Sequence, residues 1–179
     1  MRKLRTEVVV GLDLSLRAAA VCAIPIGWGQ DLTKVVTAVF GASLTQDATT
    51  RDRLERLIQI AHDIELFCIH HKATHVATEA YAFAARSSSA HALAELGGVV
   101  KTRLLDHLDI VTESIVASQA RKTLLQKLPR KKVKEYTLRN VRRLGGVTKT
   151  WTDDEIDAMV IANHLLMTCG GVAMTFEGE

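Results

Sequence analysis

Three β-prone segments follow one another at the start of the chain, and no segment between them is long enough to form a helix. The first two lie within residues 6–27 (TEVVVGLDLSLRAAAVCAIPIG) and the third within residues 32–43 (LTKVVTAVFGAS), with turn residues at Gly27 and Gly29. Strands joined by such short connections pair antiparallel. The sequence therefore predicts an antiparallel meander of three strands.

The rest of the chain alternates helical and strand patterns. Residues 49–71 carry apolar side chains at helical spacing, at Leu54, Leu57, Ile58, Ala61, Ile64 and Cys68. We expect four further elements, a strand at 74–80, a long helix at 87–108, a strand at 110–118 and a last helix at 152–166. This order predicts an α/β fold with a five-stranded mixed β-sheet flanked by α-helices.

A chain of 179 residues fits one domain, which we place at residues 1–168, followed by a tail at 169–179 that is either a short strand or disordered. Its three cysteines, Cys22, Cys68 and Cys169, are far apart and lack zinc-site spacing, as expected in a reducing compartment. We find no signal-peptide pattern and no run long enough to span a membrane. A cytoplasmic protein is the expectation.

The positive charge is concentrated in one segment. Residues 121–149 hold eleven Lys or Arg against the single acid Glu135, whereas the rest of the chain holds 12 basic and 19 acidic residues. We expect two short helices here, separated at Pro129. A solvated helix face is one explanation of this segment. A phosphate backbone as its partner explains the one-sided charge better.

Carboxylates interrupt apolar segments at three places. Asp13 lies within the first strand, Glu79 ends the fourth, and Asp154 and Asp157 leave the same face of the last helix. Buried carboxylates need a counter-charge, and hard divalent cations such as Mg²⁺ supply one. Two such ions about 4 Å apart serve in-line displacement at phosphorus. The sequence therefore predicts a metal-dependent phosphodiesterase.

Three segments, VVVGLDLSLRAAAVCAI, TEAYAFAARSSSAHALAELGGVVKTRL and DDEIDAMVIANHLL, resemble the signatures of the RuvC family of Holliday-junction resolvases, which have the RNase H-like fold. The resemblance runs from about Val8 to Leu166. It implies a crossover junction endodeoxyribonuclease, a homodimer that cuts four-way or other branched DNA symmetrically by a two-metal mechanism. The cofactor would be Mg²⁺, with Mn²⁺ as a substitute, and the implied metal ligands are Asp13, Glu79, Asp154 and Asp157. Asp153 is the alternative to Asp154.

The resemblance also implies residues that contact DNA. Where the family pattern has Phe three residues after the Glu, this chain has Ala82, and either neighbour, Tyr81 or Phe83, could stack on a base. Arg86 is expected to contact DNA as well. Lys122 matches a catalytic lysine that would stabilise charge on the scissile phosphate. The register of a second lysine stays open among Arg130, Lys131 and Lys132.

Other functions remain open at this point. The same fold could act on RNA or an RNA–DNA hybrid, and a non-catalytic binder of branched nucleic acid would keep the basic segment without needing four acids. An actin-like ATPase is disfavoured by the length and by the missing phosphate-binding glycine loops. The paired glycines Gly97 and Gly98 fall inside a helix, where close approach of a second subunit is their natural use. No feature of the sequence points to a helicase partner.

Overall fold

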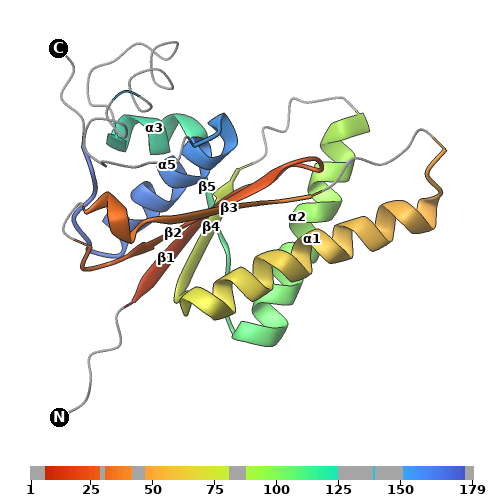
Figure 1. Ribbon diagram of the computed structural model, residues 1–179, viewed down its shortest axis with the longest axis horizontal. Helices are drawn as coiled ribbons and strands as arrows, with labels where there is room; N and C mark the ends of the chain where they lie inside the picture. The colour runs from red at the N-terminus through yellow and green to blue at the C-terminus, as the bar shows by residue number, and fades with distance from the viewer. Residues whose placement is uncertain are drawn as a thin grey trace.

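The computed structural model describes residues 7–28, 31–41, 47–80, 88–124, 139 and 151–175. Five strands form one sheet in the order β3-β2-β1-β4-β5 (Figure 1). The strands are β1 (Val8–Asp13), β2 (Ala19–Pro25), β3 (Val36–Phe40), β4 (His75–Glu79) and β5 (Glu113–Ile115). The helices are η1 (Leu32–Lys34), α1 (Thr50–His71), α2 (Ser88–Leu108), α3 (Ala117–Leu124) and α5 (Asp153–Thr168).

The sheet is mixed, as predicted. The pairs β1–β2 and β2–β3 are antiparallel, which confirms the meander, and β1–β4 and β4–β5 are parallel. The third segment differs from the prediction at its start, because residues 32–34 form a 3₁₀ turn, in which Asp31 accepts a hydrogen bond from the Thr33 N–H. The fifth strand is only three residues long, because α3 begins at Ala117.

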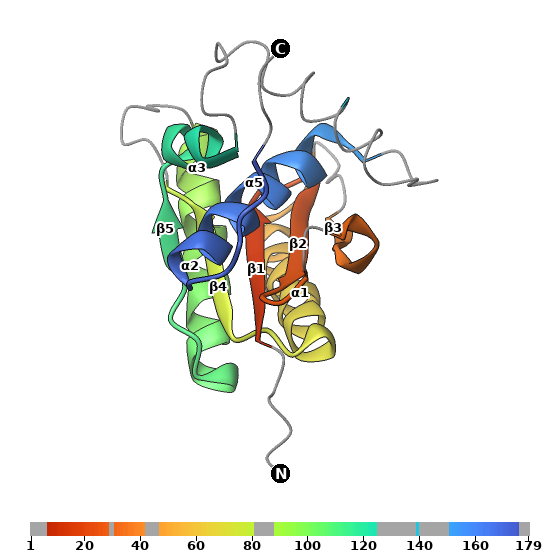
Figure 2. The ribbon, with the colours of Figure 1, turned by 90° about the vertical axis from the view of Figure 1, so that its left-hand side faces the viewer.

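Helices cover both faces of the sheet (Figure 2). Successive side chains of a strand point to opposite faces. In β1, Val8, Val10 and Leu12 pack with α1 and α2 in one apolar core. Val9 packs with α5 in the other core, so Gly11 and Asp13, at alternate positions, lie on the α5 face.

The helix α1 is fixed at both ends. A capping box links Thr49 and Asp52 at its start, and Lys72, with φ of 56°, ends it in the left-handed conformation. Its buried face contains Leu57, Ile60, Ala61, Ile64, Phe67 and Cys68. Leu54 and Ile58 are 52% and 51% exposed, whereas Leu57, which lies between them along α1, is 5% exposed.

The helix α5 lies directly on β1. Thr152 is its N-cap and forms a capping box with Glu155, while Trp151 and Ile156 are both buried in the core beneath. Gly11 permits this contact, because a Cβ at that position would overlap the backbone of Ala158 and Ala162. The close approach sets the height of α5 above the sheet.

Residues 171–175 contain no strand, and they pack against the domain. The Asn163 side chain donates to the Met174 carbonyl and accepts from its N–H, at 2.9 and 2.7 Å. The Trp28 indole donates to the Val172 carbonyl at 3.2 Å. Cys22, Cys68 and Cys169 are free thiols, and none of the described helices is long and apolar enough to cross a membrane.

Candidate active site

Asp13 and Glu79 end neighbouring parallel strands. The β1–β4 register pairs Leu12 with Thr78, so each acid is the next residue beyond that pair. Adjacent strands lie about 4.8 Å apart. Because side chains alternate along β1 and Val9 lies on the α5 face, Asp13 lies on that face too. Ala77 packs in the same core as Val9, so Glu79 shares that face. Both acids are half-buried.

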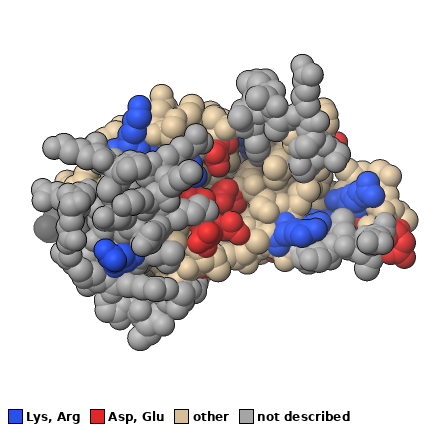
Figure 3. Space-filling view, turned by 90° about the horizontal axis from the view of Figure 1, so that it is seen from above, with Lys and Arg blue, Asp and Glu red and all other residues tan. Residues whose placement is uncertain are grey.

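The start of α5 lies at the same end of the sheet. In Figure 2 the helix crosses β1 with its first turn toward the carboxyl ends of the strands. Asp154 and Asp157 are half-buried, whereas Asp153 is exposed. The exposure of Asp153 favours Asp154 as the residue that faces the site. Viewed from this end, Asp and Glu side chains gather in the middle of the face, with Lys and Arg on both sides (Figure 3).

Glu155 has a different role from its acidic neighbours. It is 2% exposed and accepts a hydrogen bond from Thr37 Oγ1 of β3 at 2.6 Å. It also accepts from the Thr152 N–H and hydroxyl at 2.8 and 3.1 Å. This carboxylate ties the start of α5 to the sheet edge. Glu155 thereby fixes where Asp154 and Asp157 lie.

The helix α3 brings cations to the acids. The Arg121 guanidinium donates to Asp157 Oδ1 at 3.4 Å, and the two side chains are 22% and 16% exposed. Thr123 Oγ1 and His164 Nδ1 lie 2.6 Å apart and hold α3 against α5. Lys122, the predicted catalytic lysine, is exposed on α3. Sequence reasoning counted Arg121 only within the basic segment, because its pairing with Asp157 depends on helix packing.

The donor set has the chemistry of a magnesium site, since all four expected ligands are carboxylates at one end of the sheet. Within the described residues, however, no three His, Cys, Asp or Glu side chains are arranged so that they could hold a metal ion together. Asp157 instead faces Arg121. The strands and the helix that carry the acids thus lie at one end of the sheet. The described carboxylates do not form a complete ligand set around one ion position.

Six expected DNA contacts lie outside the described residues, namely Tyr81, Phe83, Arg86, Arg130, Lys131 and Lys132. The same holds for the helices expected on either side of Pro129, apart from α3 and Arg139. The roles of these six residues stay predictions.

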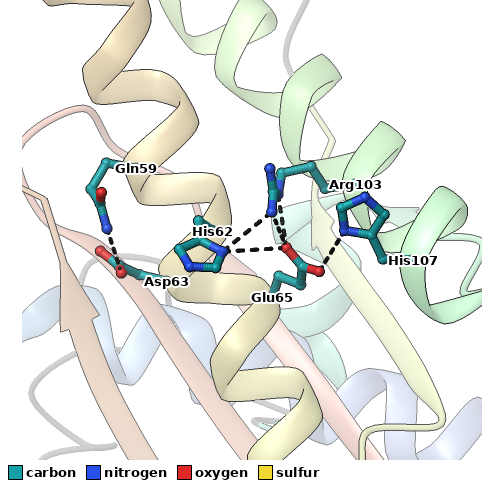
Figure 4. Close-up of polar contacts among 6 residues, drawn as sticks. All are labelled: Gln59, His62, Asp63, Glu65, Arg103 and His107. Atoms are coloured by element: carbon teal, nitrogen blue, oxygen red, sulfur yellow. Dashed lines mark hydrogen bonds and ion pairs between the residues drawn. The ribbon is translucent and has the colours of Figure 1, made fainter.

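A second polar cluster lies between α1 and α2, on the other face of the sheet (Figure 4). Glu65 is 6% exposed and accepts hydrogen bonds from Arg103 Nε at 2.8 Å and from its Nη2. His107 Nδ1 lies 2.6 Å from Glu65 Oε1, and His62 Nδ1 lies 3.2 Å from Arg103 Nη2. Burial acts to raise the pKa of Glu65, but hydrogen bonds from Arg103 and His107 outweigh it and leave the pKa lowered. This cluster joins two helices.

The fold is shared with solved structures at low sequence identity. Over 94% of this chain and 98% of the other, it superposes on Thermus thermophilus RuvC in complex with Holliday junction substrate, with a TM-score of 0.68 and 15% identity. A second Thermus thermophilus RuvC structure gives 0.64 and 16% identity over 92% and 97% of the two chains. The yeast mitochondrial Holliday junction resolvase Ydc2 gives 0.60 and 13% identity over 90% and 78%.

No protein-family model matches the chain, and no curated protein matches it by sequence. Two of these structural neighbours are RuvC and the third is another Holliday junction resolvase, and the architecture is the RNase H-like fold that the resemblance implied. At these identities the likeness establishes the fold.

Proposed function

We propose that the protein is a divalent-metal-dependent endonuclease that cuts four-way or other branched DNA. The observation that carries this proposal is the placement of Asp13 and Glu79 on adjacent strand ends beneath the acidic start of α5. Support comes from the shared fold, because the first of the structural neighbours is a RuvC bound to a Holliday junction substrate. Hydrolysis of a phosphodiester is the reaction that such a carboxylate group serves.

In this proposal Asp13, Glu79, Asp154 and Asp157 would hold Mg²⁺, or Mn²⁺ in its place. When bound, the metal supplies Lewis acidity toward an attacking water and a leaving oxygen. The chain's own task is to hold the carboxylates at fixed positions, which β1, β4 and the capped start of α5 do. Asp157 would turn from Arg121 toward the ion.

Cations on α3 would act on the substrate. Once released from Asp157, Arg121 would pair with a phosphate oxygen through its planar guanidinium. Lys122, one residue further and exposed, would place an ammonium near the scissile phosphate and stabilise the charge that develops there.

A homodimer is the second part of the proposal. The outward face of α2 presents four exposed residues at helical spacing, Ala94, Gly98, Thr102 and Leu105. A Cβ at Gly98 would meet open space among the described residues, so packing within the chain gives no reason for glycine there. Glycine inside a helix costs about 1 kcal/mol relative to alanine. Close approach of the same helix from a second copy would account for it.

Cleavage of a synthetic four-way junction tests the activity. Paired symmetric nicks that require Mg²⁺ or Mn²⁺ are expected, and Asp154→Asn should abolish them while Asp153→Asn retains them. Preferential cutting of an RNA–DNA hybrid duplex would favour the ribonuclease alternative. Junction binding without cleavage in either metal would favour a non-catalytic binder and contradict the proposal.

Sedimentation velocity tests the dimer. Gly98→Leu should shift the protein toward the monomer, because the larger side chain holds two α2 helices apart. Arg53→Leu, on the outer side of α1, adds the same side chain elsewhere and should leave the mass unchanged. A monomeric parent protein would contradict this part of the proposal.

A further inference from the structure

Arg56, in the second turn of α1, has unsatisfied hydrogen-bonding capacity. Its Nε and Nη2 atoms are buried and have no hydrogen-bond partner in the described part of the protein. The residue as a whole is half-buried, so the guanidinium lies against the surface. Buried N–H groups of a cation that lack acceptors destabilise the folded protein. These N–H groups therefore lack an acceptor among the described residues, and a phosphate oxygen is an acceptor that would satisfy them.

A second arginine increases the cost. Burial lowers the pKa of Arg56, and the nearby positive charge of Arg17 lowers it further. Three other arginines of the described residues face carboxylates: Arg51 pairs with Glu55, Arg103 with Glu65, and Arg121 with Asp157. No such ion pair is found for Arg17 or Arg56 in the same part of the chain. Two like charges held together in this way favour an anion between or beside them.

The position of Arg17 is fixed by its turn. Ser15 Oγ accepts hydrogen bonds from the N–H groups of Arg17 and Ala18, at 3.3 and 3.4 Å. Gly41, with φ of 129°, brings the end of β3 against the Arg17 carbonyl, where an added Cβ would come within 2.8 Å. The backbone at Arg17 is thus held from two sides, although its side chain is exposed.

The pair lies beside the carboxylates. Arg17 is four residues beyond Asp13, in the turn that follows β1, and α1 begins on the same side of the molecule (Figure 1). Figure 3 shows Lys and Arg side chains on this side of the acidic group, opposite those near α3. A strand that crosses the acids from α3 would next meet the turn and α1.

We propose that Arg17 and Arg56 bind a phosphate of the nucleic-acid strand on the α1 side of the carboxylates. This inference rests on the proposed nuclease function and names residues that the family resemblance did not supply. Nε and Nη2 form the side edge of a guanidinium, which pairs with two oxygens of one phosphate. Because Nε and Nη2 are buried, the Arg56 side chain must change rotamer to present this edge to the strand. The contact positions the strand and takes no part in the chemistry.

Salt-dependent binding tests the inference. In full-length protein carrying Asp13→Asn, the affinity for a labelled four-way junction is measured by fluorescence anisotropy at several NaCl concentrations. Adding Arg17→Gln and Arg56→Gln should weaken binding about tenfold near 0.1 M salt and reduce the salt slope by about 1 for each phosphate that is no longer neutralised. Arg51→Gln, on the same helix but paired with Glu55, should change neither quantity.

The melting temperature separates binding from folding. Arg56→Gln removes a half-buried charge that has no acceptor among the described residues, so the variant should melt at or above the temperature of its parent. Unchanged affinity and salt slope in the double variant would overturn the inference and leave the nuclease proposal standing. A parent protein that binds no nucleic acid would overturn both. A variant that melts lower and binds normally would show that Arg56 supports the fold and would contradict the inference.

Discussion

Two carboxylate–arginine pairs lie on opposite faces of the sheet and differ in the length of the contact and in the exposure of the carboxylate. Glu65 faces Arg103 and His107, with contacts of 2.8 and 2.6 Å, and its side chain is 7% exposed. Asp157 faces Arg121 across 3.4 Å, and its side chain is 16% exposed. The first carboxylate is held by short contacts within a buried cluster, whereas the second has a longer contact with Arg121 and is more exposed. The comparison teaches that a short, buried pairing joins two helices, while the longer and more exposed one lies at the end of the sheet where the acids gather (Figure 3).

The largest expected effect is on cleavage. Asp13→Asn or Asp157→Asn should lower the rate of junction cleavage about a thousandfold, since a neutral amide is a poor ligand for a hard cation. The melting temperature should not fall, because each change removes one of several like charges. Cleavage rates and calorimetric melting on the same samples check this, with Asp106→Asn on α2 as the control. A normal cleavage rate in both variants would remove Asp13 and Asp157 from the site.

Gly11→Ala should lower both the stability of the protein and the rate of junction cleavage, because α5 lies directly on this residue. The added methyl overlaps the backbone of α5, and overpacking of this kind costs about 1–3 kcal/mol of the free energy of unfolding. The helix that carries Asp154 and Asp157 would move, so cleavage should fall as well. Chemical denaturation together with the cleavage assay measures the two effects. Unchanged stability would show that α5 is not seated on β1 as described.

Arg103→Met should affect stability alone. It leaves Glu65 buried with one partner fewer, at a cost of about 2–3 kcal/mol. The rate of junction cleavage should equal that of the parent, because the cluster lies on the other face of the sheet. Urea denaturation measures the loss in the free energy of unfolding. A loss of cleavage in a fully folded variant would contradict the separation of the two faces.

The stability of the protein should depend on pH through Glu65. Its pKa in the folded protein lies below the ordinary value of 4.5, so its contribution is fully present above that value and is lost as the pH falls through the folded pKa. Glu65→Gln should be less stable than the parent at pH 7, and the difference should shrink below pH 4.5. Melting temperatures of both proteins between pH 3 and 7 check this. A difference that stays constant would rule out Glu65 as the cause.

The smallest effect is expected at Arg121. Partly exposed ion pairs contribute about 0.2–1 kcal/mol, so Arg121→Gln should raise the affinity for Mn²⁺ by no more than about fivefold. Calorimetric titration of the metal measures this without reference to activity. Arg103→Gln is the matched control and should leave the affinity unchanged. Weaker metal binding in Arg121→Gln would contradict competition between Arg121 and the ion.

The order of elements could be read from the sequence because hydrophobic periodicity is local. Strands one to three, α1 and α5 follow from side chains close together in the chain. Asp13 and Glu79 could be assigned to the first and fourth strands from the sequence, but their closeness depends on the parallel pairing of β1 with β4. Contacts between distant segments could not be predicted, and Arg121–Asp157 and Glu65–Arg103 are of this kind. No hydrophobic pattern in the sequence predicts that Met174 packs against α5, because its position depends on two hydrogen bonds with the Asn163 side chain.

The account depends on the claim that Asp13 and Glu79, with the acids of α5, hold divalent cations. A crystal of the full-length protein soaked in Mn²⁺ tests this most directly, because the anomalous signal of manganese locates the ion independently of the surrounding structure. We predict anomalous peaks bonded to the carboxylates of Asp13 and Glu79, with Asp157 turned away from Arg121. A crystal without a peak at these carboxylates, at a concentration of Mn²⁺ that supports cleavage, would contradict the account.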